Sequence, residues 1–327
     1  RKVHNDKFDS KKLALIALKP DLKVSVIPSD LVLDLRNLTR EYYNLMDCRS
    51  AYVNKLQGEL RVAFPQYIGI FSKLTVETSL ALLEKYAIPA AFLAAKKSAV
   101  IKVISSTARF GMAYAERQYQ LIISAARAAT SFGHALPSND KLIKLYVSFI
   151  KKYDQEVDGI LAAMHELVDA HPDESFVKQI HLIETIRGAG FLSAVTVMCE
   201  IGDFSVFKSP KQLFAYFGLD PAVKQSGKFI GTDVKISKRG SPLARRVIHT
   251  MALVSIGLTR KGVANNPVLR DYYLSKCQSK PKMVALGAVM HKVCNIVFAI
   301  LRDEKPFAVI SPSQHKLNYL QSRCLAA

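Results

Sequence analysis

No stretch of this 327-residue chain approaches the roughly 20 consecutive apolar residues that a membrane-spanning helix needs. The first ten residues, RKVHNDKFDS, likewise lack the apolar core of a secretory signal peptide. We therefore expect no membrane span and a cytoplasmic protein. The chain also lacks an initiator methionine, so we expect that the full protein continues upstream of Arg1.

Cysteine is scarce, and the five cysteines are dispersed along the chain. No two of them are spaced as a CxxC metal-binding pair, and the eight histidines form no cluster with them. An odd number of scattered cysteines is typical of proteins from a reducing compartment. The sequence therefore predicts neither a structural zinc site nor a disulfide framework.

Acidic residues are outnumbered, because 46 lysines and arginines stand against 27 aspartates and glutamates. The formal net charge of +19 favours a nucleic-acid partner, with an anionic membrane surface as the less favoured alternative. Half of the residues are hydrophobic, which is enough for a sizeable core and argues against global disorder. The length suggests two domains.

The positive charge is densest in the segment 226–246, which reads SGKFIGTDVKISKRGSPLARR. Its only acid is Asp233, and its Ser-Gly pair begins at Ser226. Such a field binds polyanions, and phosphodiesters above all. A serine hydroxyl held there can either position a phosphate or attack one, and the residues alone leave both roles open. The predicted nucleic-acid-binding residues of this region are Lys224, Lys228, Lys235, Lys238, Arg239, Arg245 and Arg246.

Two serines of this segment differ in their predicted duties. Ser241 precedes Pro242, and a serine N-cap followed by proline at the first helical position is a strong helix start. Ser226 has no such structural duty, and Gly227 frees the backbone beside it. The apolar residues between these two serines predict a short β-hairpin around Gly231.

A glycine turn lies upstream of the basic segment. Gly188 and Gly190 stand between two apolar helical patterns, as in a helix-hairpin-helix element, and Arg187 precedes them. In such elements glycines let backbone amides approach a phosphate next to a helix N-terminus. A tight turn with no ligand explains the same residues, and both interpretations stay open. We include Arg187, Gly188 and Gly190 among the predicted nucleic-acid-binding residues.

The first half of the chain carries two long heptad-like patterns. One covers residues 31–56, has Arg49 as its polar interruption and is stopped by Pro65. The other runs over residues 139–170, with Ser138 as its predicted N-cap. These patterns suit a helical arm or a dimerising coiled coil, and they suit an ordinary helical bundle equally well.

Shorter helices are predicted between the two long ones, over residues 74–130, with breaks near Pro89 and Gly111. Near the C-terminus, residues 283–301 form an apolar helical pattern that contains His291 and Lys292. We interpret this last pattern as a core helix.

Asp6 and Asp9 stand three residues apart just before an apolar run. On a helix they would share one face, where two carboxylates can hold a divalent metal. The simpler alternative is that they are acids of a first helical turn that offset the helix macrodipole.

Taken in order, these pieces resemble one family, the IS110 insertion-sequence transposases. Members pair a RuvC-like domain bearing a DEDD acidic set with a C-terminal serine transposase domain, and a bridge RNA guides them. The matching segments cover nearly the whole chain and read RKVHNDKFDS, LRNLTREYYNLMDCRSAYVNKL, IETIRGAGFLSAVTVMCEIGDFSVFKSPKQLFAYFGLDP and QSGKFIGTDVKISKRGSPLARR.

The resemblance implies a role for each matching position. Asp6 and Asp9 become the last two metal-binding acids, and the first Asp and the Glu of the set would lie upstream of Arg1. Ser226 becomes the nucleophile, whereas Ser237 and Ser241 align with flanking positions. One departure is Arg187, which stands where the family usually has a proline before its glycine turn.

The fold that the resemblance implies is mainly α. Residues 1–28 would end a RuvC-like α/β domain, residues 29–175 would form a coiled-coil arm, and residues 176–327 would form an α-rich transposase domain with a helix-hairpin-helix-like element and a short β-hairpin.

The implied activity is that of a DNA transposase or recombinase that forms a serine-phosphodiester intermediate. Mg²⁺ and a structured guide RNA would assist it, and DNA, RNA and further copies in a homodimer or tetramer would be its partners. Two alternatives remain: a catalytically inactive, truncated nucleic-acid-binding protein, and a metal-dependent junction nuclease in which Ser226 only positions DNA.

Overall fold

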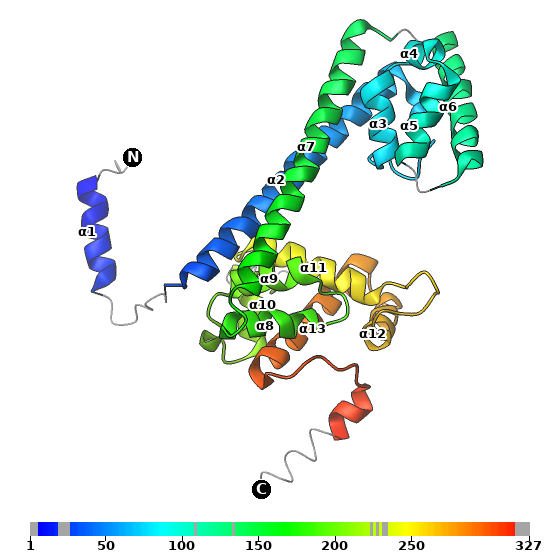
Figure 1. The fold of residues 1–327 in the computed structure, drawn as a ribbon. Helices are drawn as coiled ribbons and strands as arrows, with labels where there is room; N and C mark the ends of the chain where they lie inside the picture. The colour runs from blue at the N-terminus through cyan, green and yellow to red at the C-terminus, as the bar shows by residue number, and fades with distance from the viewer. Residues whose placement is uncertain are drawn as a thin grey trace. The chain divides into compact units, whose positions relative to one another are not determined.

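The computed structural model describes residues 6–18, 27–107, 110–132, 135–222, 225–226, 229–230 and 235–317. Helices dominate them, which confirms the prediction of a mainly α protein (Figure 1). The chain divides into two compact units. We call Asn37–Pro172 the middle unit, and Arg1–Arg36 together with Asp173–Ala327 the terminal unit. The domain boundaries at residues 28 and 175 remain a prediction.

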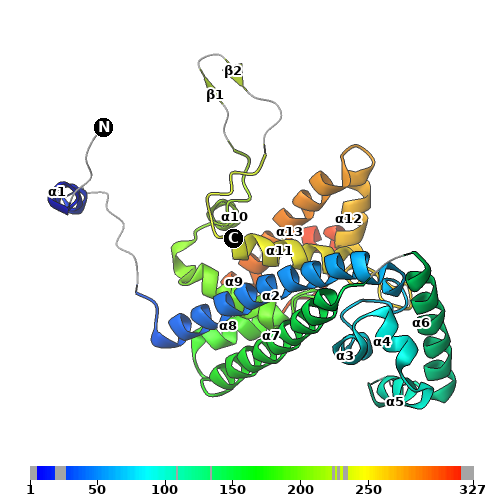
Figure 2. The ribbon, with the colours of Figure 1, turned by 90° about the horizontal axis from the view of Figure 1, so that it is seen from above.

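Two long helices pack side by side in the middle unit (Figures 1 and 2). They are α2 (Asp30–Ala63), whose first residues belong to the terminal unit, and α7 (Pro137–Asp169). Their contacts show that they run antiparallel: Tyr52 stacks near Phe149 with ring centroids 4.7 Å apart, and the amide of Asn139 donates to Glu59 at 2.9 Å. The two predicted long patterns are therefore confirmed as helices.

The polar interruption at Arg49 lies inside this seam. Its guanidinium makes a bidentate pair with Asp154, with Nε to Oδ1 at 2.5 Å and Nη2 to Oδ2 at 3.1 Å. Because the Arg49 side chain is only 19% exposed, a shift in the alignment of the two helices would leave its charge unpaired. The pair therefore fixes the register of α2 against α7.

The start of α7 differs from the prediction. The N-cap is Leu136 with Pro137 at the first helical position, so Ser138 already lies inside the helix and its prediction as N-cap was wrong. Asn139 does the capping, because its Oδ1 accepts a hydrogen bond from the Leu136 amide at 2.8 Å. Proline in the first turn suits its fixed φ and missing donor.

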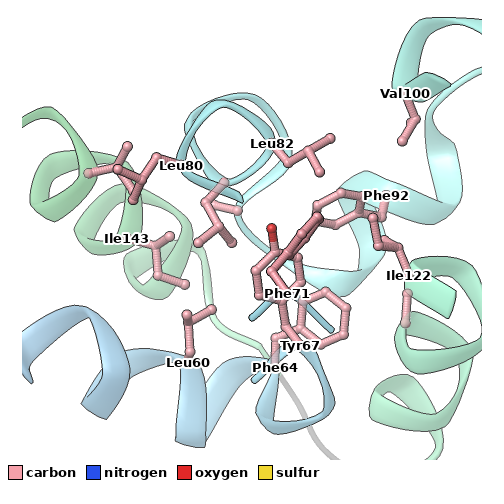
Figure 3. Close-up of a cluster of buried hydrophobic side chains, with 14 of the residues drawn as sticks. Leu60, Phe64, Tyr67, Phe71, Leu80, Leu82, Phe92, Val100, Ile122 and Ile143 are labelled. Atoms are coloured by element: carbon pink, nitrogen blue, oxygen red, sulfur yellow. The ribbon is translucent and has the colours of Figure 1, made fainter. Parts of the chain in front are cut away.

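Short helices close the middle unit, and the breaks at Pro89 and Gly111 are confirmed. Their apolar faces meet the end of α2 in a core rich in aromatic residues (Figure 3). At its centre the Tyr67 hydroxyl donates to the Ser79 carbonyl at 3.1 Å, and burial raises the pKa of Tyr67. The elements are η1 (Pro65–Tyr67), α3 (Glu77–Tyr86), α4 (Pro89–Ala94), α5 (Lys97–Thr107) and α6 (Met112–Phe132).

The terminal unit packs its helices around α11 (Pro242–Ile256) and α13 (Lys282–Asp303), which contact each other and most of the remaining helices. The prediction of a core helix over residues 283–301 is confirmed, because its apolar residues, such as Val289 and Val293, are buried. The other elements are α1 (Asp6–Ala17), α8 (Ser175–Glu184), α9 (Phe191–Ile201), η2 (Phe204–Val206), α10 (Pro210–Tyr216), β1 (Gln225–Ser226), β2 (Phe229–Ile230) and α12 (Pro267–Cys277).

Among the described residues, α13 alone is long and apolar enough to cross a membrane, with a mean hydropathy of 1.9. About half of that window, 56%, is buried against the rest of the protein. A core helix passes the same test by length and composition, and the packing of α13 against α11 is that of a core helix.

Candidate nucleic-acid interface

The basic segment leaves the helical body after α10 and returns to it at α11. At its base the backbones of Gly218 and Gly240 come into direct contact. A Cβ added to Gly240 would lie 1.9 Å from the Tyr216 carbonyl oxygen, and one added to Gly218 would lie 2.6 Å from the Arg239 amide nitrogen. Gly218 also has a φ of +67°, which favours glycine. Both positions therefore require glycine to close the base of the loop.

The two chain segments that rise from this base are paired in antiparallel fashion. Ser237 donates its amide to the Asp220 carbonyl at 2.7 Å, and Ala222 donates to Lys235 at 2.8 Å. Lys238, with the left-handed φ of +56°, closes the pairing by donating to the Gly218 carbonyl at 3.0 Å. The lower part of the loop is thus an ordered two-segment stem, which we call the loop stem.

Farther along the loop, β1 and β2 pair with Gln225 opposite Ile230 and Ser226 opposite Phe229 (Figure 2). Gly231, around which the sequence predicts a short β-hairpin, lies outside the described residues, so that centre remains a prediction. The backbone of Ser226 is described in β1, but its side chain lies outside the described residues, as do Lys224 and Lys228.

The other two serines of the segment have structural partners. The Ser237 hydroxyl donates to Asp220 Oδ1 at 2.5 Å, which ties the two sides of the loop stem together. The Ser241 hydroxyl accepts from the Ala244 amide at 3.2 Å, which confirms the predicted N-cap of α11. Both hydroxyls therefore have structural partners, and the assignment of the nucleophile to Ser226 remains a prediction.

Four of the predicted nucleic-acid-binding side chains are solvent-exposed on and beside the loop stem, namely Lys235, Lys238, Arg239 and Arg246. Arg245 differs from them. Its Nη1 donates to the carbonyls of Phe217 at 3.2 Å and Gly240 at 2.6 Å, so it anchors the base of the loop. The sequence did not predict this structural duty. The contact of Arg245 with nucleic acid remains a prediction.

The glycine turn joins α8 to α9. Gly188 has a φ of +111°, and a Cβ there would lie 2.9 Å from the Ser255 hydroxyl of α11. That hydroxyl donates to the Arg187 carbonyl at 3.0 Å, so α11 covers one side of the turn. Close packing therefore explains Gly188 without any ligand. Gly190 and the Arg187 side chain are exposed and remain available to a partner.

The structure does not bring the glycine turn and the basic loop together. The loop stem meets α11 at its first turn, near Ser241, whereas the glycine turn contacts Ser255 at the far end. Fourteen residues of helix at about 1.5 Å each separate them by about 20 Å. The two predicted contacts would therefore fall on different parts of one bound nucleic acid.

Asp6 and Asp9 lie in the first turn of α1 and are exposed. Their placement on one helix turn fits both of the predicted roles, metal binding and compensation of the macrodipole. No group of three or more histidines, cysteines, aspartates or glutamates within the described ranges is arranged to hold a metal ion.

Sequence reasoning missed two functional features of the terminal unit. The first is Asp220, whose carboxylate holds Ser237; its position before Pro221 gave no signal. The second is the exposure of Lys292 on the otherwise apolar α13. A lysine in the middle of the apolar stretch 283–301 is a usable signal, because such a residue must reach solvent or an anion.

The basic loop and its surroundings match a family of known proteins. Residues 180–274 match the family model described as Transposase IS116/IS110/IS902 family. The match begins in α8 and ends in α12, so it contains the glycine turn, the whole basic loop and α11.

Curated relatives agree with this match. The uncharacterized 44.8 kDa protein of insertion element IS116 from Streptomyces clavuligerus is 24% identical over 316 residues, which cover 94% of this chain and 74% of that protein. The 43.6 kDa protein of IS110 from Streptomyces coelicolor is 22% identical over 252 residues, 76% of this chain and 58% of that protein.

A third relative is the pilin gene-inverting protein of Moraxella lacunata, which is 27% identical over 160 residues, 48% of this chain and 47% of that protein. The chain therefore spans about half to three quarters of the length of these relatives. The segment with the glycine turn and the basic loop is thus similar to the transposases of the IS116, IS110 and IS902 family.

Proposed function

We propose that this chain is part of a DNA recombinase that cuts and rejoins strands through a covalent bond to Ser226. The observation that carries the proposal is the family match over the segment that contains the Ser-Gly pair and its basic loop. The name of the Moraxella relative, a gene-inverting protein, describes the same class of DNA rearrangement. For this chain we propose the DNA-cutting activity, the serine nucleophile, and the Mg²⁺ and guide RNA that assist it.

The chemistry is a transesterification at phosphorus. The Ser226 hydroxyl oxygen forms a bond to the phosphorus of a DNA phosphodiester, and the bond from that phosphorus to the 3′ oxygen breaks. The serine proton passes to a base, and the departing 3′ oxygen takes up a proton to become a hydroxyl. Because the serine ester is again a phosphodiester, a different 3′-hydroxyl can attack it and release Ser226 without ATP.

A serine hydroxyl is a weak nucleophile at neutral pH and needs activation, while the phosphate repels it through its own negative charge. Cations around the phosphate reduce this repulsion. The exposed ammonium and guanidinium groups of Lys235, Lys238 and Arg239 sit on the stem of the loop that carries Ser226, where they can contact the backbone on either side of the cut.

Asp6 and Asp9 would hold Mg²⁺. This ion commonly takes one or two carboxylates and completes its shell with water and substrate phosphate, which two exposed acids on one helix turn can provide. When bound, Mg²⁺ supplies charge neutralisation at the phosphate. We propose that upstream residues contribute the two further acids of the set, as the end of a RuvC-like domain at residues 1–28 would require.

The proposal has two further parts. A structured guide RNA selects the DNA sequence, and copies of the protein in a dimer or tetramer together form the catalytic site. Exposed lysines and arginines contact backbone phosphates of RNA and DNA alike, so they position a nucleic acid without reading its sequence. Base pairing with a guide would then supply the selection that such contacts lack.

The test uses the full protein expressed from its own gene in a plasmid recombination assay, with nucleic-acid binding measured in parallel. Ser226→Ala should abolish strand exchange and leave binding within about twofold of the wild type. Ser241→Ala is the matched control: it removes an N-cap worth about 0.5–2 kcal/mol of stability and should still recombine.

Each other outcome has a defined meaning. Recombination by Ser226→Ala would refute the nucleophile, and loss of cleavage only in Asp6→Asn and Asp9→Asn would favour a metal-dependent nuclease. Binding without any recombination by the wild-type protein would identify an inactive nucleic-acid-binding protein.

A further inference from the structure

Positive side chains from two helices converge on one tyrosine of the terminal unit. Lys276 of α12 and Lys292 of α13 each place Nζ 5.3 Å from the ring centroid of Tyr272. The two ammonium groups therefore lie no farther apart than twice that distance, close to one Debye length of about 8–10 Å in physiological salt. The ring of Tyr272 thus gathers two positive charges on one surface.

A third lysine joins them through His291. The His291 ring packs edge-on against Phe214 of α10, with centroids 4.6 Å apart. Partial burial, together with the positive charges of Lys292 and Lys211, lowers the pKa of His291. Lys211 precedes Phe214 by three residues on α10, so the two side chains lie on the same face of that helix, which meets α13 at His291.

The three lysines have no ion-pair partner in the described part of the chain. Arg302, at the end of α13, is by contrast paired with its neighbour Asp303. Helices α10 and α12 both pack against α13, so the positions of the three lysines are set by the fold. A surface that gathers cations without acids is stabilised by an external anion.

We propose that Lys211, Lys276 and Lys292 form a binding site for the phosphate groups of a nucleic-acid backbone, separate from the basic loop. We call it the lysine cluster. The proposal rests on the proposed function only for the identity of the ligand, because the convergence of charge is a property of this fold. Ammonium groups on flexible stems suit backbone phosphates, which they contact as point charges without reading bases.

The test compares two triple variants of the full protein. Lys211→Gln, Lys276→Gln and Lys292→Gln together remove the lysine cluster. Lys178→Gln, Lys305→Gln and Lys316→Gln remove the same charge from exposed lysines elsewhere in the same unit. Binding of fluorescent duplex DNA and of a structured RNA is measured across a salt series, and inorganic phosphate is added as a competitor.

The cluster variant should bind about tenfold or more weakly, and its salt slope should fall by roughly one unit for each backbone phosphate that the lysines no longer neutralise. The control variant should change affinity much less. A larger loss of affinity with one probe assigns the site to DNA or to RNA.

Equal losses of affinity in both variants, or no loss in the cluster variant, would overturn the proposal. Displacement of all binding by millimolar phosphate would show a small-anion site instead.

A second measurement follows the pKa of His291, which lies beside the lysine cluster. Because Lys211 and Lys292 disfavour the charged imidazole, a phosphate that neutralises them should raise the pKa of His291, as followed by NMR titration with and without a DNA oligonucleotide. An unchanged His291 while the oligonucleotide binds would place the binding surface elsewhere. Failure of the wild-type protein to bind either nucleic acid would refute the proposed function, whereas binding that leaves the cluster untouched would refute only this inference.

Discussion

The two units of the chain differ most in their treatment of charge. The terminal unit has 30 lysines and arginines against 15 acids, while the middle unit has 16 against 12. In the middle unit basic residues meet acids: Arg49 pairs with Asp154, Lys97 with Glu116, Lys144 with Asp140 and Lys151 with Glu84. The terminal unit also has ion pairs, such as Arg302 with Asp303, but it exposes further cations around the basic loop and in the lysine cluster.

This difference separates a scaffold from a binding surface. The middle unit is held by an aromatic core and by a helix seam in which a carboxylate pairs with the Arg49 guanidinium. The terminal unit keeps like charges close together, and it gains free energy when an anion covers them. Mutations in the two units should therefore affect different measurements.

The largest effect on stability is expected from Phe92→Ala in the middle unit. Phe92 is fully buried and stacks within 6.0 Å of Phe64, Tyr67 and Tyr86, so its removal should cost about 3–5 kcal/mol. Leu93→Ala, at an exposed position, is the control and should cost far less. Denaturant unfolding combined with hydrogen exchange measures both. If Phe92→Ala lowered hydrogen-exchange protection in α11 and α13 as much as in the middle unit, the two units would not unfold separately.

Gly240→Ala should have the next largest effect, confined to the terminal unit. The new methyl group would overlap the Tyr216 carbonyl, and such overpacking costs about 1–3 kcal/mol and opens the base of the loop. Nucleic-acid binding should fall with it. The matched control is Gly58→Ala in α2, where a Cβ meets no atom within 4 Å and should stabilise the helix slightly. Unchanged protease resistance of the loop in Gly240→Ala would contradict the tight closure.

The smallest effect is expected from the seam pair. Arg49→Met should cost about 1 kcal/mol, because Asp154 remains 42% exposed and keeps much of its hydration. The double variant Arg49→Met, Asp154→Leu should recover that loss, since an apolar pair of similar volume fits a helix seam. A double-mutant cycle by thermal unfolding measures the coupling. A double variant less stable than Arg49→Met would show that the charge pair is needed for more than register.

Local signals in the sequence predicted the elements well. Pro65, Pro89 and Gly111 mark real helix breaks, and Ser241 with Pro242 starts α11 as expected. The error at Ser138 arose because a serine was preferred as N-cap over the proline before it, which fixes the first turn. Within the second long pattern, Ile143 and Val147 face the core, whereas Leu145 is 43% exposed.

The contacts that shape the candidate site could not be predicted in this way. The approach of Gly218 to Gly240 and the anchoring by Arg245 join backbone groups that periodicity does not relate. The lysines of the lysine cluster lie on three helices, and its first and last members, Lys211 and Lys292, are more than 80 positions apart in the sequence. Only the packing of α10, α12 and α13 brings these charges to one surface.

The covalent intermediate tests the central claim most directly. The full protein is incubated with its nucleic-acid substrate, denatured, and digested for mass spectrometry of any DNA-linked peptide. The account predicts a nucleotide attached through a phosphodiester to Ser226 in the peptide around Gln225–Lys228, and none in Ser226→Ala. Strand exchange without any protein–DNA adduct, or an adduct on Ser237 or Ser241, would contradict it.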